Sequence, residues 1–301
     1  MRIIFLGTSA AVPTVDRSLS SIAVDMGREY ILIDAGEGVQ KQIMLTGLGF
    51  GKLSRIIITH LHGDHYFGIF PLLQTMSILR RSSPLDIIAP AGFSSIYKAL
   101  KEITPTLTSY EVRITEVNGE NEFRLLNCTL KMFPVCHGNT PTYGISIKED
   151  DKPGRFDPEK SDKLGVPVEL RGVLQKGIPI KLPDGKVIRP EDVMGPPRKG
   201  AKVVFSSDTR PCDSLLKEAE NADVLIHEAT YDDDKKDRAE KTGHSTISEA
   251  IEVGIASKAR KIVLTHFSAR YKKEDLEKME TKIREKYENV IFARDLMVID
   301  L

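Results

Sequence analysis

The spacing of apolar residues along the chain predicts a mixed α/β protein. Short apolar runs bounded by turn residues predict strands, and an amphipathic stretch predicts the first helix: strands at 3–6, 21–24, 30–33 and 55–59, and a helix within 67–79. The alternation returns after residue 202, with strands at 203–206, 224–226, 262–265 and 297–299 and helices at 214–220, 245–256 and 273–286. Two similar halves are therefore expected on either side of a different middle.

The middle segment, residues 152–202, has Gly and Pro at short intervals and no long periodic apolar run. This composition predicts an arm or hairpin inserted between the halves, although a solvated loop has the same composition. The 301-residue length fits one large domain, residues 1–301, with the segment as its insertion.

Charge separates the middle segment from the rest of the chain. Overall, 43 Lys and Arg balance 43 Asp and Glu, which argues against a generic basic nucleic-acid binder. Residues 152–202 contain 12 Lys and Arg and 7 Asp and Glu, so the segment carries +5 and the remainder carries −5. The neutral total therefore conceals a basic segment that could contact an anionic partner.

Three features predict a cytoplasmic protein. No apolar run approaches the roughly 18 residues that cross a bilayer, so no membrane span is expected. The apolar run at 3–6 ends at Gly7 and is too short for a secretion signal. Three cysteines without a close CxxC pair suit a reducing compartment.

Four potential metal ligands occur within six residues, directly after the strand predicted at 55–59: His60, His62, Asp64 and His65. A strand that ends in a tight glycine turn can direct the first two histidines to one point and the last two residues to a neighbouring point. The spacing can therefore serve two metal ions. Imidazole and carboxylate ligands suit Zn²⁺, with Mn²⁺ or Fe less favoured.

Further metal-capable side chains follow other predicted strands. They are His137, Asp208, His227 with Glu228, and His266, while His244 precedes a predicted helix. In open α/β folds, ligands bind beyond the carboxyl ends of the strands. Any one of these histidines alone would more often be structural, but together with the first cluster they favour a common site.

These residues resemble the ligand series of the metallo-β-lactamase superfamily. That series consists of the motif H-x-H-x-D-H, followed by a distant His, an Asp and a last His. Within the superfamily the chain closely resembles the ribonuclease Z family, endonucleases that trim the 3′ trailer of precursor tRNA. The matching segments are 5–9, Pro13-Thr14, 34–38, 59–68, Gly154-Arg155-Phe156, 206–209, His227-Glu228-Ala229-Thr230, 243–245 and His266-Phe267-Ser268-Ala269-Arg270-Tyr271.

The resemblance implies an αββα sandwich with a dinuclear zinc site at one edge. It implies one zinc on His60, His62 and His137, a second on Asp64, His65 and His266, and Asp208 as the bridge between them. Asp34 is then either an acceptor for the N–H of a ligand imidazole or only a turn residue.

The resemblance also implies cleavage by a metal-activated hydroxide, which leaves a 3′-hydroxyl on tRNA and a 5′-phosphate on the trailer. Asp64 is the candidate proton acceptor. His244, oriented by Glu228, is the candidate proton donor or phosphate contact, because a neighbouring carboxylate raises the pKa of an imidazole. His227 is either structural or functional.

By the same resemblance, residues 152–202 form an arm that grips the body of tRNA, and the protein is a cytoplasmic homodimer that binds precursor tRNA. A net charge of +5 allows phosphate contacts that position RNA without reading its sequence. One departure concerns the arm: residues 168–177 lack the Gly-Pro step common ahead of the glycine turn in family arms. The detailed arm contacts are therefore open.

Two other functions remain as alternatives. A dinuclear hydrolase of the same superfamily that acts on a small phosphodiester or thioester would share the site, although it has no use for a basic arm. A non-enzymatic, zinc-dependent RNA-binding protein would have no chemical need for Asp64, Asp208 and His244.

Overall fold

The structure, a computed structural model, describes residues 1–301 and divides the chain into two compact units. The first unit comprises Met1–Arg124, Leu130–Ile147 and Lys202–Leu301. The second comprises Leu125–Thr129 and Lys148–Ala201. None of the helices is both long enough and apolar enough to span a membrane.

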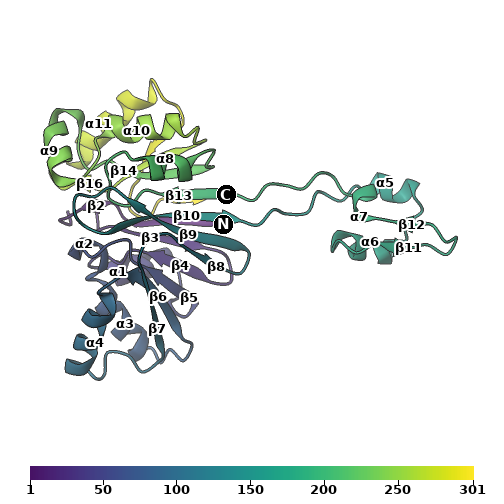
Figure 1. Ribbon diagram of the computed structural model, residues 1–301, viewed down its shortest axis with the longest axis horizontal. Helices are drawn as coiled ribbons and strands as arrows, with labels where there is room; N and C mark the ends of the chain where they lie inside the picture. Colours follow the sequence, from purple (N-terminus) through teal and green to yellow (C-terminus); the bar gives the residue numbers. More distant parts are fainter. The chain divides into compact units, whose positions relative to one another are not determined.

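Two seven-stranded sheets form the centre of the first unit (Figure 1). The first sheet has the order β18-β1-β3-β4-β5-β6-β7, antiparallel from β18 to β4 and parallel from β4 to β7. Its strands are β1 (Arg2–Gly7), β3 (Ser21–Asp25), β4 (Tyr30–Ile33), β5 (Leu53–Ile57), β6 (Leu85–Pro90), β7 (Val112–Val117) and β18 (Val298–Asp300).

The second sheet has the order β17-β15-β14-β13-β10-β9-β8, and β13, β14, β15 and β17 run parallel. Its strands are β8 (Asn121–Arg124), β9 (Cys128–Val135), β10 (Thr142–Glu149), β13 (Lys202–Phe205), β14 (Val224–Glu228), β15 (Ile262–Thr265) and β17 (Val290–Phe292). A short parallel pair, β2 (Ser9–Ala10) with β16 (Phe267–Ser268), joins the two halves of the sequence.

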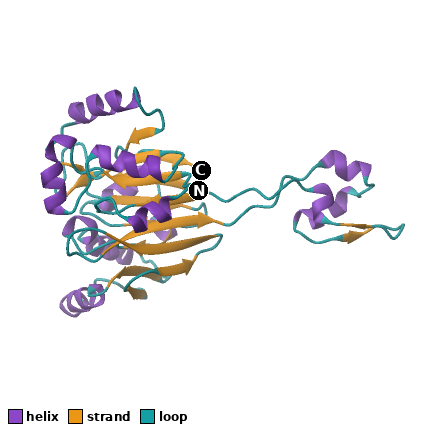
Figure 2. Ribbon diagram, turned by 45° about the horizontal axis from the view of Figure 1, so that its top comes forward, coloured by secondary structure: helices purple, strands orange, loops and turns teal.

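Helices cover the outer face of each sheet, as Figures 1 and 2 show. On the first sheet they are α1 (Val39–Thr46), α2 (Gly63–Tyr66), α3 (Ile69–Ile78) and α4 (Phe93–Ile103), with the 3₁₀ turn η1 (Phe50–Lys52). On the second they are α8 (Asp213–Ala219), α10 (Ile247–Ala256) and α11 (Lys273–Arg284). The 3₁₀ turn η2 (Asp233–Lys235) and α9 (Lys236–Thr242) lie between β14 and α10 in the sequence. The αββα sandwich that the resemblance implied is confirmed.

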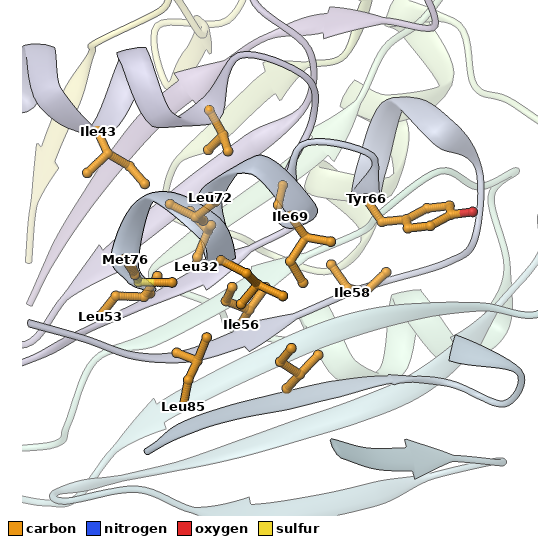
Figure 3. Packing of buried hydrophobic residues seen from close by; sticks show 14 of the residues in the cluster. Leu32, Ile43, Leu53, Ile56, Ile58, Tyr66, Ile69, Leu72, Met76 and Leu85 are labelled. Atoms are coloured by element: carbon orange, nitrogen blue, oxygen red, sulfur yellow. The ribbon is translucent and has the colours of Figure 1, made fainter. Parts of the chain in front are cut away.

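Burial on both faces explains why the strands are apolar throughout. Side chains alternate across a strand, so Ile4 and Leu6 of β1 pack in the helix-side cluster while the equally buried Ile3 and Phe5 face the other way. Figure 3 shows this cluster, in which Leu72 and Met76 of α3 lie against residues of the strands. The buried sheets form a rigid base for the loops at their ends.

The second unit contains five short elements: α5 (Pro158–Lys163), α6 (Val168–Gln175), β11 (Ile180–Lys181), β12 (Val187–Ile188) and α7 (Pro190–Val193). β11 and β12 pair as an antiparallel hairpin. The unit has an apolar cluster of its own, built from Val166, Leu174, Ile180, Leu182, Ile188 and Val193. The alternative of a solvated loop is therefore wrong, because the segment folds around a small core.

Candidate metal centre

The residues predicted to bind metal meet where strands of the two sheets end. His60 and Asp208 each follow their strand, β5 or β13, by three residues, and His266 follows β15 directly. In the first sheet β5 runs parallel to β4 and β6, and in the second β13 and β15 both run parallel to β14, so the carboxyl ends of these strands lie at one edge of each sheet. The fold thereby joins side chains that are up to 206 residues apart in the sequence, from His60 to His266.

One group consists of His60, His62, His137 and Asp208. His62 Nδ1 lies 3.1 Å from His60 Nε2 and 3.2 Å from His137 Nε2. Asp208 Oδ2 lies 3.6 Å from His60 Nε2 and 3.9 Å from His137 Nε2. These four side chains can contact a single ion.

A second group consists of Asp64, His65 and His266. The Nε2 atoms of His65 and His266 are 3.2 Å apart, and Asp64 Oδ2 lies 3.6 Å from each. Asp208 faces this group as well, with Oδ2 at 3.4 Å from His65 Nε2 and Oδ1 at 3.4 Å from His266 Nε2. The Asp208 carboxylate therefore lies between the two groups.

The two groups contain five histidines, and each has one ring nitrogen that points toward the other ligands (inward) and one that points away from them (outward). Every outward nitrogen lies next to an oxygen acceptor, which fixes the orientation of the ring and its tautomer. The acceptors are Asp34 Oδ2 for His65 (2.6 Å), Gly243 O for His137 (2.9 Å), Thr230 Oγ1 for His266 (3.0 Å), Thr59 Oγ1 for His60 (3.1 Å) and Thr140 Oγ1 for His62 (3.3 Å). Asp34 also accepts from the backbone and hydroxyl of Thr59. The structure thus places Asp34 against His65, rather than in a turn alone.

The inward nitrogens fit a bound cation. A histidine binds metal in its neutral form, which has one N–H; when the outward nitrogen carries that N–H, the inward nitrogens present lone pairs to one another. Lone pairs 3.1–3.2 Å apart repel unless a cation lies between them. Tetrahedral zinc with Zn–N bonds of about 2.0–2.1 Å separates its nitrogen ligands by about 3.3–3.4 Å, close to the observed spacing.

Charge at the site also favours a cation. Burial raises the pKa of Asp208, but the adjacent His266 and His65 outweigh it and hold this pKa well below its usual range. Burial lowers the pKa of His65, but the carboxylates of Asp208 and Asp34 raise it well above the ordinary value. Burial and the neighbouring His65 keep the pKa of His60 well below its usual value. The ionised carboxylates thus favour a positive charge beside them, which is a proton on His65 or a bound metal cation.

Strained backbone accompanies the site. Asp34, Ser207 and His266 have φ of 58°, 56° and 60°, a left-handed conformation that costs side-chain-bearing residues energy. Gly68, just after the histidine cluster, has no room for a side chain, because a Cβ there would lie 2.0 Å from the carbonyl oxygen of Gly36. The surrounding sheets maintain these conformations.

His244 lies beside the two groups, bound to a buried carboxylate. Its Nδ1 donates to Glu228 Oε1 over 2.8 Å and is 3.9 Å from Asp208 Oδ2. Glu228 is fixed in turn by the backbone N–H groups of Thr209 and Thr230. Burial lowers the pKa of His244, but the Glu228 carboxylate outweighs it and raises this pKa to about 9.

His227 is separate from both groups. It neighbours Glu228 in β14, and successive side chains of a strand point to opposite faces, so only one of the two can face the site. His227 is fully buried, with Nδ1 2.6 Å from the Glu228 carbonyl oxygen and no partner for Nε2. The structural alternative for His227 fits this position.

Several contacts at the site were not predicted. Thr230 links Glu228 to His266 through its hydroxyl, and the backbone N–H of Ala11 donates to Asp64 Oδ2 over 2.8 Å. Thr230 lies in the segment His227-Glu228-Ala229-Thr230, which was among the segments that carry the resemblance, so the sequence could have pointed to a role for it at the site. Ala11 had no such signal, because every residue except proline has a backbone N–H.

Comparisons with known proteins place the chain among metallo-β-lactamase proteins. Residues 1–153 match the family model for anti-Pycsar protein Apyc1, and residues 189–267 match the model for a beta-lactamase superfamily domain. Curated relatives match nearly end to end. Ribonuclease Z of Methanosarcina mazei is 40% identical over 100% of this chain and 98% of its own length.

Two further relatives agree. Ribonuclease Z of Gemmatimonas aurantiaca is 40% identical over 99% of this chain and 95% of its own length. The crystal structure of human tRNase Z, short form, superimposes with a TM-score of 0.72 and 28% identity, covering 100% of this chain and 99% of the human one.

Proposed function

The chain belongs to the ribonuclease Z family of the metallo-β-lactamase superfamily, and from that premise we propose that it removes the 3′ trailer of precursor tRNA at a dinuclear zinc site. Membership makes it a hydrolase and an endoribonuclease. The observation that carries the zinc proposal is the convergence of five inward-facing imidazole nitrogens on the Asp208 carboxylate.

The donor groups suggest how two ions would be held. One would bind His60, His62 and His137, and the other Asp64, His65 and His266, with Asp208 between them. When bound, zinc would activate water at neutral pH and neutralise charge that develops on the phosphate oxygens. Asp34 and Thr230 would keep His65 and His266 in the tautomer that presents Nε2 inward.

Two side chains would move protons. Asp64, fixed by the N–H of Ala11, would accept the proton of the attacking water. His244, held by Glu228, would donate a proton to the departing 3′-oxygen, so that tRNA ends in a 3′-hydroxyl and the trailer begins with a 5′-phosphate. The buried Glu228 acts by orienting His244 and by keeping its imidazole protonated.

Metal removal tests the zinc proposal. Dialysis against a chelator is expected to remove about two zinc ions per chain and to abolish cleavage of precursor tRNA, because the inward nitrogens lose the cation between them. Added Zn²⁺ should restore cleavage in proportion to the metal regained, measured by elemental analysis on the same samples. Full cleavage by demonstrably metal-free protein would contradict the proposal.

The second unit would hold the tRNA body as an arm. Residues 152–202 carry +5, enough for contacts with several RNA phosphates. The unit folds around its own apolar cluster, so its basic residues belong to a defined surface. We also propose that the protein is a cytoplasmic homodimer, as the family resemblance implies.

Deletion of residues 152–202 tests the arm. The deletion should lower kcat/KM for precursor tRNA by about 100-fold or more, because several phosphate contacts are lost together. Hydrolysis of bis(4-nitrophenyl) phosphate, which is too small to reach an arm, should change far less. Parallel loss of both activities would mean that the segment is scaffold, and equal retention of both would favour a small phosphodiester as the natural substrate.

A further inference from the structure

Arg270 presents a guanidinium group that has no carboxylate partner. It is exposed, it lies in the turn after β16, and its Nε donates to Ser268 Oγ over 3.0 Å. Its guanidinium carbon lies 5.2 Å from the ring centroid of Tyr231. The side chain is therefore oriented by a hydroxyl and an aromatic ring, while its two terminal nitrogens have no hydrogen-bond acceptor in the chain.

Tyr231 connects this guanidinium to the catalytic centre. Its buried ring contacts the imidazole of His244 edge-on, with centroids 6.1 Å apart. A second exposed arginine, Arg238 of α9, lies 5.9 Å from the same ring and donates from Nε to the Tyr231 hydroxyl over 3.3 Å. Two guanidinium groups thus share one aromatic ring beside His244, at the end of the unit where α9 and β16 lie (Figure 1).

Arg17 holds the turn that carries Arg270. Its buried guanidinium donates to the carbonyl oxygens of Ser268 and Tyr271, at 3.0 and 2.9 Å, one on each side of Arg270. The Tyr271 hydroxyl in turn accepts from the backbone N–H of Asp232. A turn fixed at both ends positions its side chain with little loss of conformational freedom on binding.

The neighbouring carboxylates have partners other than the two arginines. Asp232 accepts from the backbone N–H of Asp233 over 2.9 Å, and Asp233 accepts from Ser248. Asp234 pairs with Lys235 over 2.5 Å. None of these three carboxylates forms an ion pair with Arg270 or Arg238.

We propose that Arg270, supported by Tyr231 and Arg17, binds a backbone phosphate of the RNA substrate adjacent to the scissile phosphate. A guanidinium offers paired donors that match phosphate oxygens, and it reads no base, so the contact would position any precursor tRNA. Arg238 would add a second positive charge on the same ring. The inference rests on the proposed function, because it takes RNA as the substrate.

The test compares Arg270→Ala with wild type on precursor tRNA over a range of KCl concentrations. Loss of one phosphate contact is expected to lower kcat/KM about tenfold or more at low salt. It should also reduce the slope of log kcat/KM against log[KCl] by about 0.7. Arg270→Lys keeps the charge without the paired donors, so it should restore the slope and only part of the rate.

Arg260→Ala is the matched control, because Arg260 is also exposed but precedes β15, at the opposite end of that strand from His266. Wild-type rate and slope are expected for it. An Arg270→Ala protein with the rate and slope of this control would overturn the inference, as would a lowered rate with an unchanged slope. Absence of precursor cleavage by wild type in the same assay would instead contradict the proposed function.

Discussion

Replacing Asp208 with asparagine is expected to abolish stable metal binding and to lower precursor-tRNA cleavage by about 1000-fold or more. The carboxylate lies within 3.6 Å of the inward nitrogens of His60, His65 and His266, so it is the one side chain that serves both groups. An amide of the same shape would remove the negative charge that is proposed to offset two dications. Zinc should fall from two ions to fewer than one per chain in elemental analysis.

The matched control for this substitution is Asp223→Asn. Asp223 accepts from the backbone N–H of Lys202 and from Arg260, near the start of β14 and away from the metal groups. Its variant should keep two zinc ions and near wild-type cleavage. If Asp208→Asn retained both ions and full activity, the assignment of Asp208 as the bridge would be wrong.

Replacing His244 with alanine should lower the turnover of precursor tRNA by about 100- to 10,000-fold while two zinc ions remain bound. His244 is held 2.8 Å from Glu228, and each of the two proposed ions would have at least three other donor side chains. Single-turnover cleavage together with elemental analysis measures both quantities. A large loss of zinc in this variant would show that His244 is a metal ligand and would contradict its assignment as the proton donor.

The leaving group offers a sharper test of the same residue. A 4-nitrophenolate departs without a proton, so His244→Ala should lose much less activity on bis(4-nitrophenyl) phosphate than on precursor tRNA. The salt dependence of precursor cleavage should stay unchanged, unlike that of Arg270→Ala. His227→Gln is the matched histidine control: His227 lies outside the metal groups, so turnover per folded molecule should remain within a few-fold of wild type.

Much of the site was predictable because its ligands follow strands. Apolar runs located β5, β13 and β15, and the polar residue just beyond each run, such as Asp208 or His266, pointed to a common edge. The same reasoning could not predict which of His227 and Glu228 faces the metal centre, because both are polar and they are adjacent in the sequence. Their separation depends on which face of β14 meets the metal centre, and this is set by the packing of the sheet.

Other features depend on contacts that no local pattern encodes. The carbonyl of Gly243 orients His137 from 106 residues away, and the ring of Tyr231 meets Arg270 across 39 residues. The helices of the second unit are short and rich in polar residues, so their periodicity was too weak to predict them. They are stabilised by the small apolar cluster around Leu174, which forms only when the segment folds.

Identification of the products tests the central claim most directly. Purified protein with zinc should be incubated with a tRNA that carries a 3′ trailer, and both product ends should be determined by sequencing and by phosphatase and ligase sensitivity. We expect a single cut at the junction of tRNA and trailer, with a 3′-hydroxyl on the tRNA and a 5′-phosphate on the trailer. Cleavage elsewhere, a 2′,3′-cyclic phosphate on the tRNA, or no cleavage would contradict the account.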